Sequence, residues 1–468
     1  MRERSVGRHW WWIGFALVGG ALTAVAAAAQ TPASGPLSLN DAIQLALKNY
    51  PAIKESRARA QAAEEGVGVA RTAYLPRLDM LWQENRATTN NVFGLLFPQS
   101  TIFSMTGPVQ GTRSLGDSVW GSAAAVLLSW EAVDFGQRKA GVGVARAQTS
   151  LARSQTAVTE LDVASAAADA FLTVLAAEAA VRAARANVDR LQVFGNTVRT
   201  LVQNQLRPGA DQSRAEAELA VANNQLSQAV QIAEVARASL ADAIGSAGTS
   251  FELTVAAVAA VPQFSIDPAD LKTHPAARAG EAAVEVVRAR QRSLDRAYAP
   301  HITFQSTFAA RGTGADAPGV PSFGNGLWLQ VPNWAVGASV TFPAFDLFSI
   351  NARKRVELQN GLAEAAHYEW TLQALTTQEV KARALMKAAT AIANNTPTER
   401  QAATAGESQA RARYQNGLAS VTEVAEAQRL LAQAEADDAV ARLSVWRALL
   451  ATAQAHGDLA PFIEKIKP

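Results

Sequence analysis

The residue types that most often carry enzymatic or metal chemistry are sparse in this chain and are not grouped. The 468 residues include no cysteine, which excludes thiol catalysis, disulfides and cysteine-ligated metals. The five histidines are scattered without the spacing of metal ligands: His9, His274, His301, His367 and His456. The sequence also lacks a phosphate-binding loop, a nucleophile elbow and a zinc signature. We therefore expect a protein that is not an enzyme and that uses neither a cofactor nor a metal.

Glu423 and Glu426 are two acidic residues three positions apart. Residues three apart lie on one face of a helix, so the two carboxylates would present a shared negative surface. Acidic residues near the start of a helix are also favourable for a simpler reason, because they lie at the positive end of the helix dipole. From these residues alone, an ordinary acidic helix start is the simpler explanation.

An internal duplication indicates which elements would position such residues. Tyr74-Leu75-Pro76 recurs 224 residues later as Tyr298-Ala299-Pro300. In both copies an alanine-rich helical pattern stops at the Tyr-x-Pro, because proline lacks an N–H and forces the preceding residue out of the helical region. Strand-like alternation follows in both copies. We predict a first structural repeat over 30–250 and a second over 251–468.

Each repeat is expected to contain a strand hairpin followed by two long helices. The strands have a two-residue period and are predicted at about 76–88, 119–130, 300–310 and 333–343. The long helices are predicted at about 137–203, 210–245, 351–416 and 420–456. The first of them carries a heptad seam that includes Leu172 and Val193. At about 1.5 Å per residue it would be roughly 100 Å long, and we expect it to be too long and too polar to cross a bilayer.

The four strands could form a soluble antiparallel sheet or could span a membrane. Their apolar faces carry Trp and Phe near the strand ends, as in the aromatic girdles of membrane barrels. Four strands cannot close a barrel, because outer-membrane barrels begin at about eight strands, and open edges are not tolerated in lipid. If the strands span a membrane, several protomers must contribute to one barrel.

The first 29 residues have the pattern of a cleaved secretory signal peptide. Three arginines precede an apolar run, and small residues precede Gln30. An uncleaved inner-membrane anchor is the alternative, since about 20 apolar residues could span a bilayer. Loss of the segment, with three arginines and one glutamate, lowers the formal charge from +2 to 0. A neutral chain gives no indication of nucleic-acid binding.

Several motifs, taken in order, resemble the TolC-type outer-membrane efflux channel family. They are Leu37-Ser38-Leu39, both Tyr-x-Pro segments, Asp134-Phe135-Gly136 and the run from Tyr414 to Ser420 followed by Glu423. The resemblance covers essentially the whole mature chain. It implies a mainly helical homotrimer whose protomers each contribute four strands to a twelve-stranded barrel in the outer membrane. The barrel would continue as a periplasmic α-helical coiled-coil barrel, which docks on a periplasmic adaptor belonging to an inner-membrane pump.

The same resemblance assigns roles to residues at both ends of the helices. Glu423 and Glu426 would line an acidic ring at the periplasmic constriction, and Asp211 would bond to Tyr414 to hold the channel shut. The family's basic partner falls on Ala419 here, so Arg207 is a candidate to replace it. The adaptor would meet turn residues at the two tips, namely Leu206, Gly209, Gly417 and Leu418. Helix would give way to strand at the Tyr-x-Pro segments, at Tyr74, Pro76, Tyr298 and Pro300.

A protein of another class remains possible from the sequence, namely a non-catalytic periplasmic scaffold or adaptor held by its N-terminal apolar segment. Adaptors usually have one coiled-coil hairpin with lipoyl-like and barrel domains. This chain is predicted to have two hairpins and duplicated strands, which favours the channel. The cargo, whether a drug, a metal ion, a metabolite or a polypeptide, is not indicated by the residues.

Overall fold

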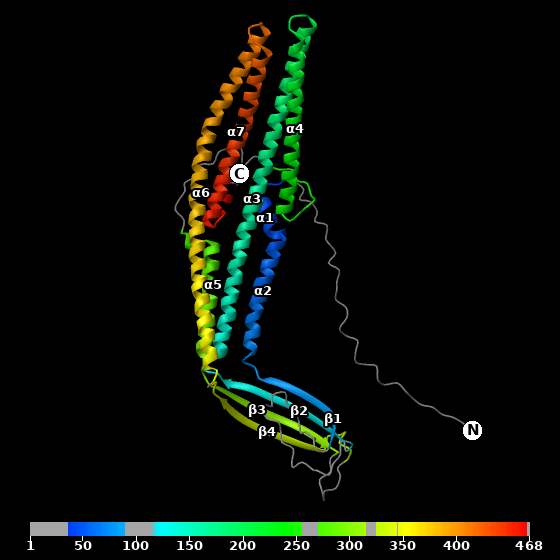
Figure 1. The fold of residues 1–468 in the computed structure, drawn as a ribbon, viewed down its shortest axis with the longest axis vertical. Coiled ribbons are helices and arrows are strands. Elements are labelled where there is room, and N and C mark those ends of the chain that lie inside the picture. Colours follow the sequence, from blue (N-terminus) through cyan, green and yellow to red (C-terminus); the bar gives the residue numbers. More distant parts are fainter. Residues whose placement is uncertain are drawn as a thin grey trace, which may run out of the picture.

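The computed structural model describes residues 36–88, 116, 118–254, 270–314, 324–343 and 345–465. The expected signal peptide and most of the loop between the first two strands lie outside these residues. Long helices form a layer that ends in a small sheet (Figure 1). The larger elements are α1 (Leu39–Asn49), α2 (Pro51–Thr72), β1 (Arg77–Thr88), β2 (Ser118–Val133), α3 (Gln137–Gln203), α4 (Gly209–Ala243), α5 (Pro275–Arg296), β3 (His301–Thr313), β4 (Val331–Thr341), α6 (Leu347–Gln415), α7 (Val421–His456) and α8 (Ala460–Glu464).

The four strands form one antiparallel sheet in the order β1-β2-β3-β4. Residues opposite one another in the ladder share a face, and the register places Met80, Val126, Phe308 and Trp334 in one such row. The neighbouring row on the same face begins with Leu78 and ends with Val336. Side chains of opposite parity, such as Asp79 and Gln305, lie on the other face. The sheet therefore has one apolar, aromatic face and one more polar face.

Several element boundaries differ from those expected from the sequence: β3 extends to Thr313, and β4 begins and ends two residues early. β2 continues to Val133, because Glu131 and Val133 pair with β3 across a bulge. The segment after Trp130 is therefore strand. α6 begins at Leu347 and not near 351, because the carbonyl of Asp346 already accepts a helical hydrogen bond of 2.8 Å from Ile350 N.

α3 is the central helix of the chain and packs against α2, α4, α5 and α7. Its 67 residues correspond to roughly 100 Å of helix. Among the described residues, this helix contains a stretch with the length and composition of a membrane span, of which 61% is buried inside the fold. That burial agrees with a helix at the core of a helical layer.

The heptad seam of α3 is followed only along its first part. Leu172 is fully buried, whereas Val193 is 62% exposed in the single chain. Leu191 and Phe194 are buried in its place. A straight α-helix drifts by about 20° per heptad, so a strict seven-residue repeat leaves the packed face after several heptads. The predicted position of Val193 on the seam was therefore wrong.

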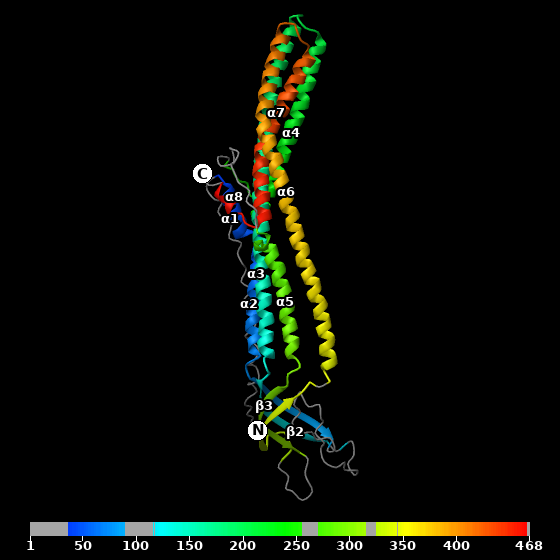
Figure 2. The same cartoon turned by 90° about the vertical axis from the view of Figure 1, so that its left-hand side faces the viewer.

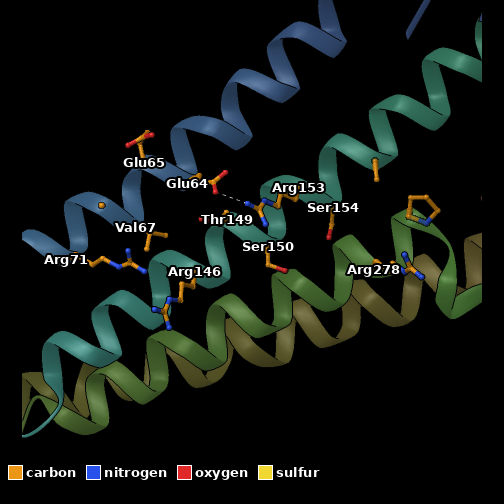
Figure 3. A pocket seen from close by; sticks show the side chains of 13 residues that line it. Glu64, Glu65, Val67, Arg71, Arg146, Thr149, Ser150, Arg153, Ser154 and Arg278 are labelled. Atoms are coloured by element: carbon orange, nitrogen blue, oxygen red, sulfur yellow. Dashed lines mark ion pairs between the residues drawn. The ribbon is translucent and has the colours of Figure 1, made fainter. Parts of the chain in front are cut away.

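A groove of about 760 Å³ lies between α2, α3 and α5 (Figure 3). Its charged lining consists of Glu64, Glu65, Arg71, Arg146, Arg153 and Arg278. Glu64 and Arg153 form an ion pair of 3.0 Å across the groove.

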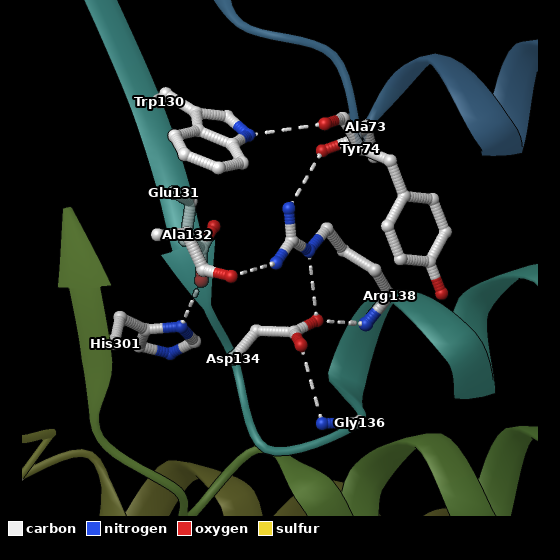
Figure 4. Close-up of polar contacts among 9 residues, drawn as sticks. All are labelled: Ala73, Tyr74, Trp130, Glu131, Ala132, Asp134, Gly136, Arg138 and His301. Carbon is white, nitrogen blue, oxygen red and sulfur yellow. Dashed lines mark hydrogen bonds and ion pairs between the residues drawn. The ribbon is translucent and has the colours of Figure 1, made fainter. Parts of the chain in front are cut away.

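The first Tyr-x-Pro segment is fixed to the start of α3 (Figure 4). The guanidinium of Arg138 lies 4.9 Å from the ring centre of Tyr74 and 3.0 Å from Asp134 Oδ2. The indole N–H of Trp130 donates a 3.1 Å hydrogen bond to the Tyr74 carbonyl. Burial acts to raise the pKa of Asp134, but the hydrogen bonds from Arg138 and Gly136 outweigh it and hold that pKa below its usual value. The side chain of Arg138 thus joins the start of α3 to the Tyr74 turn and to the end of β2.

The second Tyr-x-Pro segment has the same kind of contact with a different residue. Lys354 of α6 lies 5.3 Å from the ring centre of Tyr298 and 2.6 Å from Asp295 Oδ1. The hydroxyl of Tyr298 also donates a 2.6 Å hydrogen bond to Asn351. In both repeats, a cation of the following long helix therefore packs on the tyrosine at which the chain passes from helix to strand.

A buried histidine joins the start of α5 to the end of α7 within the second repeat. The Nδ1 of His274 accepts a 3.1 Å hydrogen bond from Ala276 N, which caps the start of α5. Its Nε2 therefore carries the proton and donates to the Gln454 carbonyl of α7 at 3.1 Å. Burial lowers the pKa of His274, although the Gln454 carbonyl and Asp162 act in the opposite direction.

We predict that acidification destabilises the fold through His274. Its pKa is lower in the folded chain than in the unfolded chain, so the unfolded state binds a proton more readily. Stability is then complete above the ordinary histidine pKa of about 6.5 and falls as the pH drops below it. The midpoint of thermal unfolding, measured between pH 7.5 and 5.5, should fall less in His274→Asn than in the parent. The exposed His367 gives the control, because His367→Asn should retain the full pH dependence; equal dependence in both variants would exclude His274 as the cause.

Candidate functional site

The two helix turns farthest from the sheet have nearly identical backbones (Figure 2). In the first turn, Leu206 N donates to the Leu201 carbonyl at 2.9 Å. In the second, Leu418 N donates to the Arg413 carbonyl at 2.8 Å. This is the Schellman arrangement, which needs one residue in the left-handed conformation at each helix end. Equivalent residues of the two tips are 212 positions apart.

The left-handed residue differs between the tips. Gly417 has a φ of 77° in the second turn, and its equivalent in the first turn is Gln205, with a φ of 60°. Gly209, which the sequence suggested as a turn residue, is instead the first residue of α4. Leu206 and Leu418 are equivalent and are 68% and 69% exposed. Each tip therefore presents one leucine to solvent, and Gln205 is a turn residue that the sequence analysis missed.

Tyr414 occupies the centre of the contact between the two tips. Its side chain is fully buried, and its ring packs edge-on against Phe194 with the ring centres 5.4 Å apart. Its hydroxyl donates a 3.2 Å hydrogen bond to Asp211 Oδ2 at the start of α4. Burial, followed by the charge of Asp211 and this hydrogen bond, raises the pKa of Tyr414 to about 12. The phenol is therefore protonated at any physiological pH and acts as a hydrogen-bond donor.

Arg207 reaches from the first tip onto the second. Its guanidinium lies 4.3 Å from the ring centre of Tyr414 and donates a 2.6 Å hydrogen bond to the Tyr414 carbonyl. A longer bond of 3.4 Å goes to the carbonyl of Ala419. Ala419 is the equivalent of Arg207 in the second repeat. The structure thus brings together Asp211, Tyr414 and Arg207, the three residues that the sequence analysis grouped.

Glu423 and Glu426 lie together on the exposed side of α7 near its start. Glu423 forms a capping box with Ser420, accepting a 3.2 Å hydrogen bond from Ser420 N. Glu426 forms an ion pair of 2.7 Å with Arg429. Each carboxylate therefore has a local structural partner, as the simpler explanation from the sequence requires. Both remain in solvent, where their charge is available to a passing ion.

The described residues of the two tips form a site of polar, aromatic and charged contacts. No group of three His, Asp or Glu side chains in the described part of the chain could hold a metal ion. The tips combine the buried hydroxyl of Tyr414, the guanidinium of Arg207 and the exposed carboxylates of Glu423 and Glu426. Such a site can hold two hairpins together, and it can attract or repel charged solutes.

Comparisons with known proteins agree on one family. The family model for outer membrane efflux proteins matches residues 42–246 and 270–458, which is well over half of the chain. A sequence search of curated proteins finds no significant match. The fold is similar to the outer-membrane channel OprN, with a TM-score of 0.71, 19% identity, and 90% of this chain and 89% of that one covered.

Two further solved structures have the same fold. The CmeC outer membrane channel of Campylobacter jejuni aligns with a TM-score of 0.73 at 15% identity, covering 92% of this chain and 89% of its own. The open state of the Neisseria gonorrhoeae MtrE outer membrane channel aligns with a TM-score of 0.70 at 20% identity, covering 90% and 89%. At these identities the likeness shows the fold alone.

We predict that Tyr414→Phe loosens the tips without unfolding them. The ring and its packing on Phe194 remain, and only the hydrogen bond to Asp211 is lost, worth about 1 kcal/mol. Hydrogen exchange of the amides at 410–424 should accelerate roughly fivefold, because these amides report local opening of the tip. Tyr368→Phe, far along α6, serves as the control and should leave that exchange unchanged. Unaltered exchange in Tyr414→Phe would show that the bond does not hold the tips.

Proposed function

The chain belongs to the outer membrane efflux protein family, and from this premise we propose that it acts as a homotrimeric outer-membrane channel that conducts efflux substrates passively. Energy would come from an inner-membrane pump, reached through a periplasmic adaptor. A cleaved N-terminal signal would export the chain.

The open sheet is the observation that carries the proposal. β1 pairs only with β2, and β4 pairs only with β3, among the described strands. Every residue of β4 is exposed in the single chain. Unpaired N–H and C=O groups are too costly in hydrocarbon, so β4 of one protomer must pair with β1 of the next. Three copies give twelve strands, which exceeds the minimum of about eight for a closed outer-membrane barrel.

The apolar face of the sheet supports contact with lipid. Met80, Trp82 and Trp334 are 80%, 62% and 77% exposed, and the register puts them on the same face. Such large apolar side chains side by side mark a surface that is covered by something other than water. The opposite face, with Asp79 and Gln305, would then line the barrel. Ordinary soluble sheets bury their apolar face against helices, but here the helical layer leaves it free.

The tips would form the closed end of the channel. Arg207 and Asp211 of one hairpin hold Tyr414 of the other, so the two hairpins of a protomer are fastened together. Glu423 and Glu426 would face the channel axis and give six carboxylates in a trimer. Such a ring attracts cations and repels anions. Arg429 offsets part of this charge, because it pairs with Glu426.

Conductance of the purified channel in a planar bilayer tests both the function and the ring. The parent should form ion-conducting trimers that trivalent cations block from the tip side. Glu423→Gln with Glu426→Gln should weaken the block about tenfold or more, since the ring loses its charge. Glutamine at 423 can still accept the capping bond from Ser420. Glu369→Gln, at an exposed position farther along α6, is the control. An absence of conductance would refute the channel, and unchanged block would refute the ring alone.

The exposed leucines at the tips give a test of adaptor docking. Leu206→Glu with Leu418→Glu places a charge where an apolar contact is expected and removes no buried contact within the chain. Cells that depend on this channel, its adaptor and its pump should lose resistance to an exported toxin, while the trimer still assembles. Leu206→Met with Leu418→Met should retain resistance. Full resistance in the glutamate variant would place the adaptor contact elsewhere.

A further inference from the structure

The groove between α2, α3 and α5 has an excess of positive charge that the chain itself does not neutralise (Figure 3). Four arginines and two glutamates line it, which leaves a formal excess of two positive charges. Arg153 is paired with Glu64. Arg71, Arg146 and Arg278 have no ion pair with any described residue, and all three are exposed. Other arginines of this fold do pair across helices, as Arg57 does with Glu160.

The groove lies on the outer side of the helical layer. The α3 residues that line it include Arg146, Ser150, Arg153 and Ala157, spaced by three or four residues and hence on one helix face. The same face continues to Leu161, Ala164, Ala168 and Leu172, which pack with α1 in the core. α1 and α8 stand out from one side of the layer, and the layer formed by α2, α3, α5 and α6 curves away from that side (Figures 1 and 2). In a closed ring of such layers, the groove faces outward.

The position of the groove argues against a lipid headgroup as its occupant. Arg146 is nine residues after the start of α3, or about 14 Å of helix from the sheet. Arg278 is eighteen residues before the end of α5, or about 27 Å. The headgroup zone of one leaflet is only about 5–8 Å deep. A lipid could reach Arg71 at the lower end, but it could not reach all three arginines.

The chemistry of the groove fits an extended acidic peptide. Guanidinium groups bind carboxylates with two parallel hydrogen bonds, and Ser150 and Ser154 add hydroxyl groups between the charged ends. Arg71 and Arg146 lie at one end of the groove and Arg278 at the other (Figure 3). A ligand that meets both ends must carry separated negative charges. The cell-wall polymer of the periplasm carries short peptide stems with several free carboxylates.

We propose that this groove binds the acidic peptide stems of peptidoglycan, and so anchors the channel where its helices cross the cell wall. The inference rests on the proposed function, because it requires these helices to lie in the periplasm. The binding would be external to the conduction path and would leave conductance unchanged. It should weaken as salt is added, because exposed ion pairs are screened.

Co-sedimentation of the purified protein with isolated peptidoglycan sacculi tests the proposal. The parent should bind, and Arg71→Gln with Arg146→Gln and Arg278→Gln should bind about tenfold more weakly, as expected for three exposed charge pairs. Arg185→Gln with Arg214→Gln and Arg411→Gln removes the same charge from exposed, unpaired positions elsewhere among the described residues, and should bind like the parent. Equal binding of the two triple variants, or no binding by the parent, would overturn the proposal.

Two further arms identify the ligand. Glycan strands stripped of their stems by an amidase should not bind, and retained binding would exclude the peptide as the ligand. Vesicles containing phosphatidylglycerol should bind the parent and the groove variant equally; preferential binding through the three arginines would assign the groove to lipid instead. Conductance in planar bilayers is measured on the same preparations. If the parent conducts but does not bind sacculi, only the proposed peptide binding by the groove is refuted. If the parent does not conduct, the proposed channel function is refuted.

Discussion

The unpaired edges of the four-stranded sheet are the constraint on which the rest of the structure depends. A strand edge can remain free in water, but it cannot remain free in hydrocarbon. β1 and β4 are such edges, and the large aromatic side chains on one face require lipid or another apolar cover. The chain therefore cannot complete its own structure at this end. In the proposed outer-membrane channel, oligomerisation would follow from backbone hydrogen bonding before any contact between helices is considered.

In the proposed channel, the barrel would set the spacing of the long helices. Two cation–tyrosine contacts would transmit that spacing from the strands to the helices. Arg138 stacks on Tyr74 and Lys354 stacks on Tyr298, so each long helix is fixed to the entrance of its hairpin. Asp134 orients Arg138, and Asp295 orients Lys354. The cations come from non-equivalent positions of α3 and α6. The repeats have thus kept the contact and changed the residue that makes it.

Local patterns could be predicted from the sequence, and contacts between distant segments largely could not. Proline and strand alternation indicate where helix gives way to strand, because both act within a few residues. The heptad rule misplaced Val193, since helix drift accumulates over a long helix. Gln205 escaped notice because a left-handed turn normally favours glycine. The contact of Arg207 with Tyr414 joins residues 207 positions apart, and only the resemblance to a family suggested that the two tips meet.

The duplication also places different residues at equivalent positions of the two tips, so that one tip holds the hairpins together and the other carries exposed carboxylates. Asp211 and Glu423 are equivalent positions at the starts of α4 and α7, as are Arg207 and Ala419. In the first repeat, Asp211 accepts a hydrogen bond from the Tyr414 hydroxyl, and Arg207 reaches across to the second turn. In the second repeat no cation occupies the equivalent position, and the acid caps its own helix and stays in solvent. The two acids of the second hairpin are exposed, and Glu426 pairs with Arg429 of its own helix. In the proposed channel, one hairpin would hold the closed state, and the carboxylates of the other would determine which ions approach it.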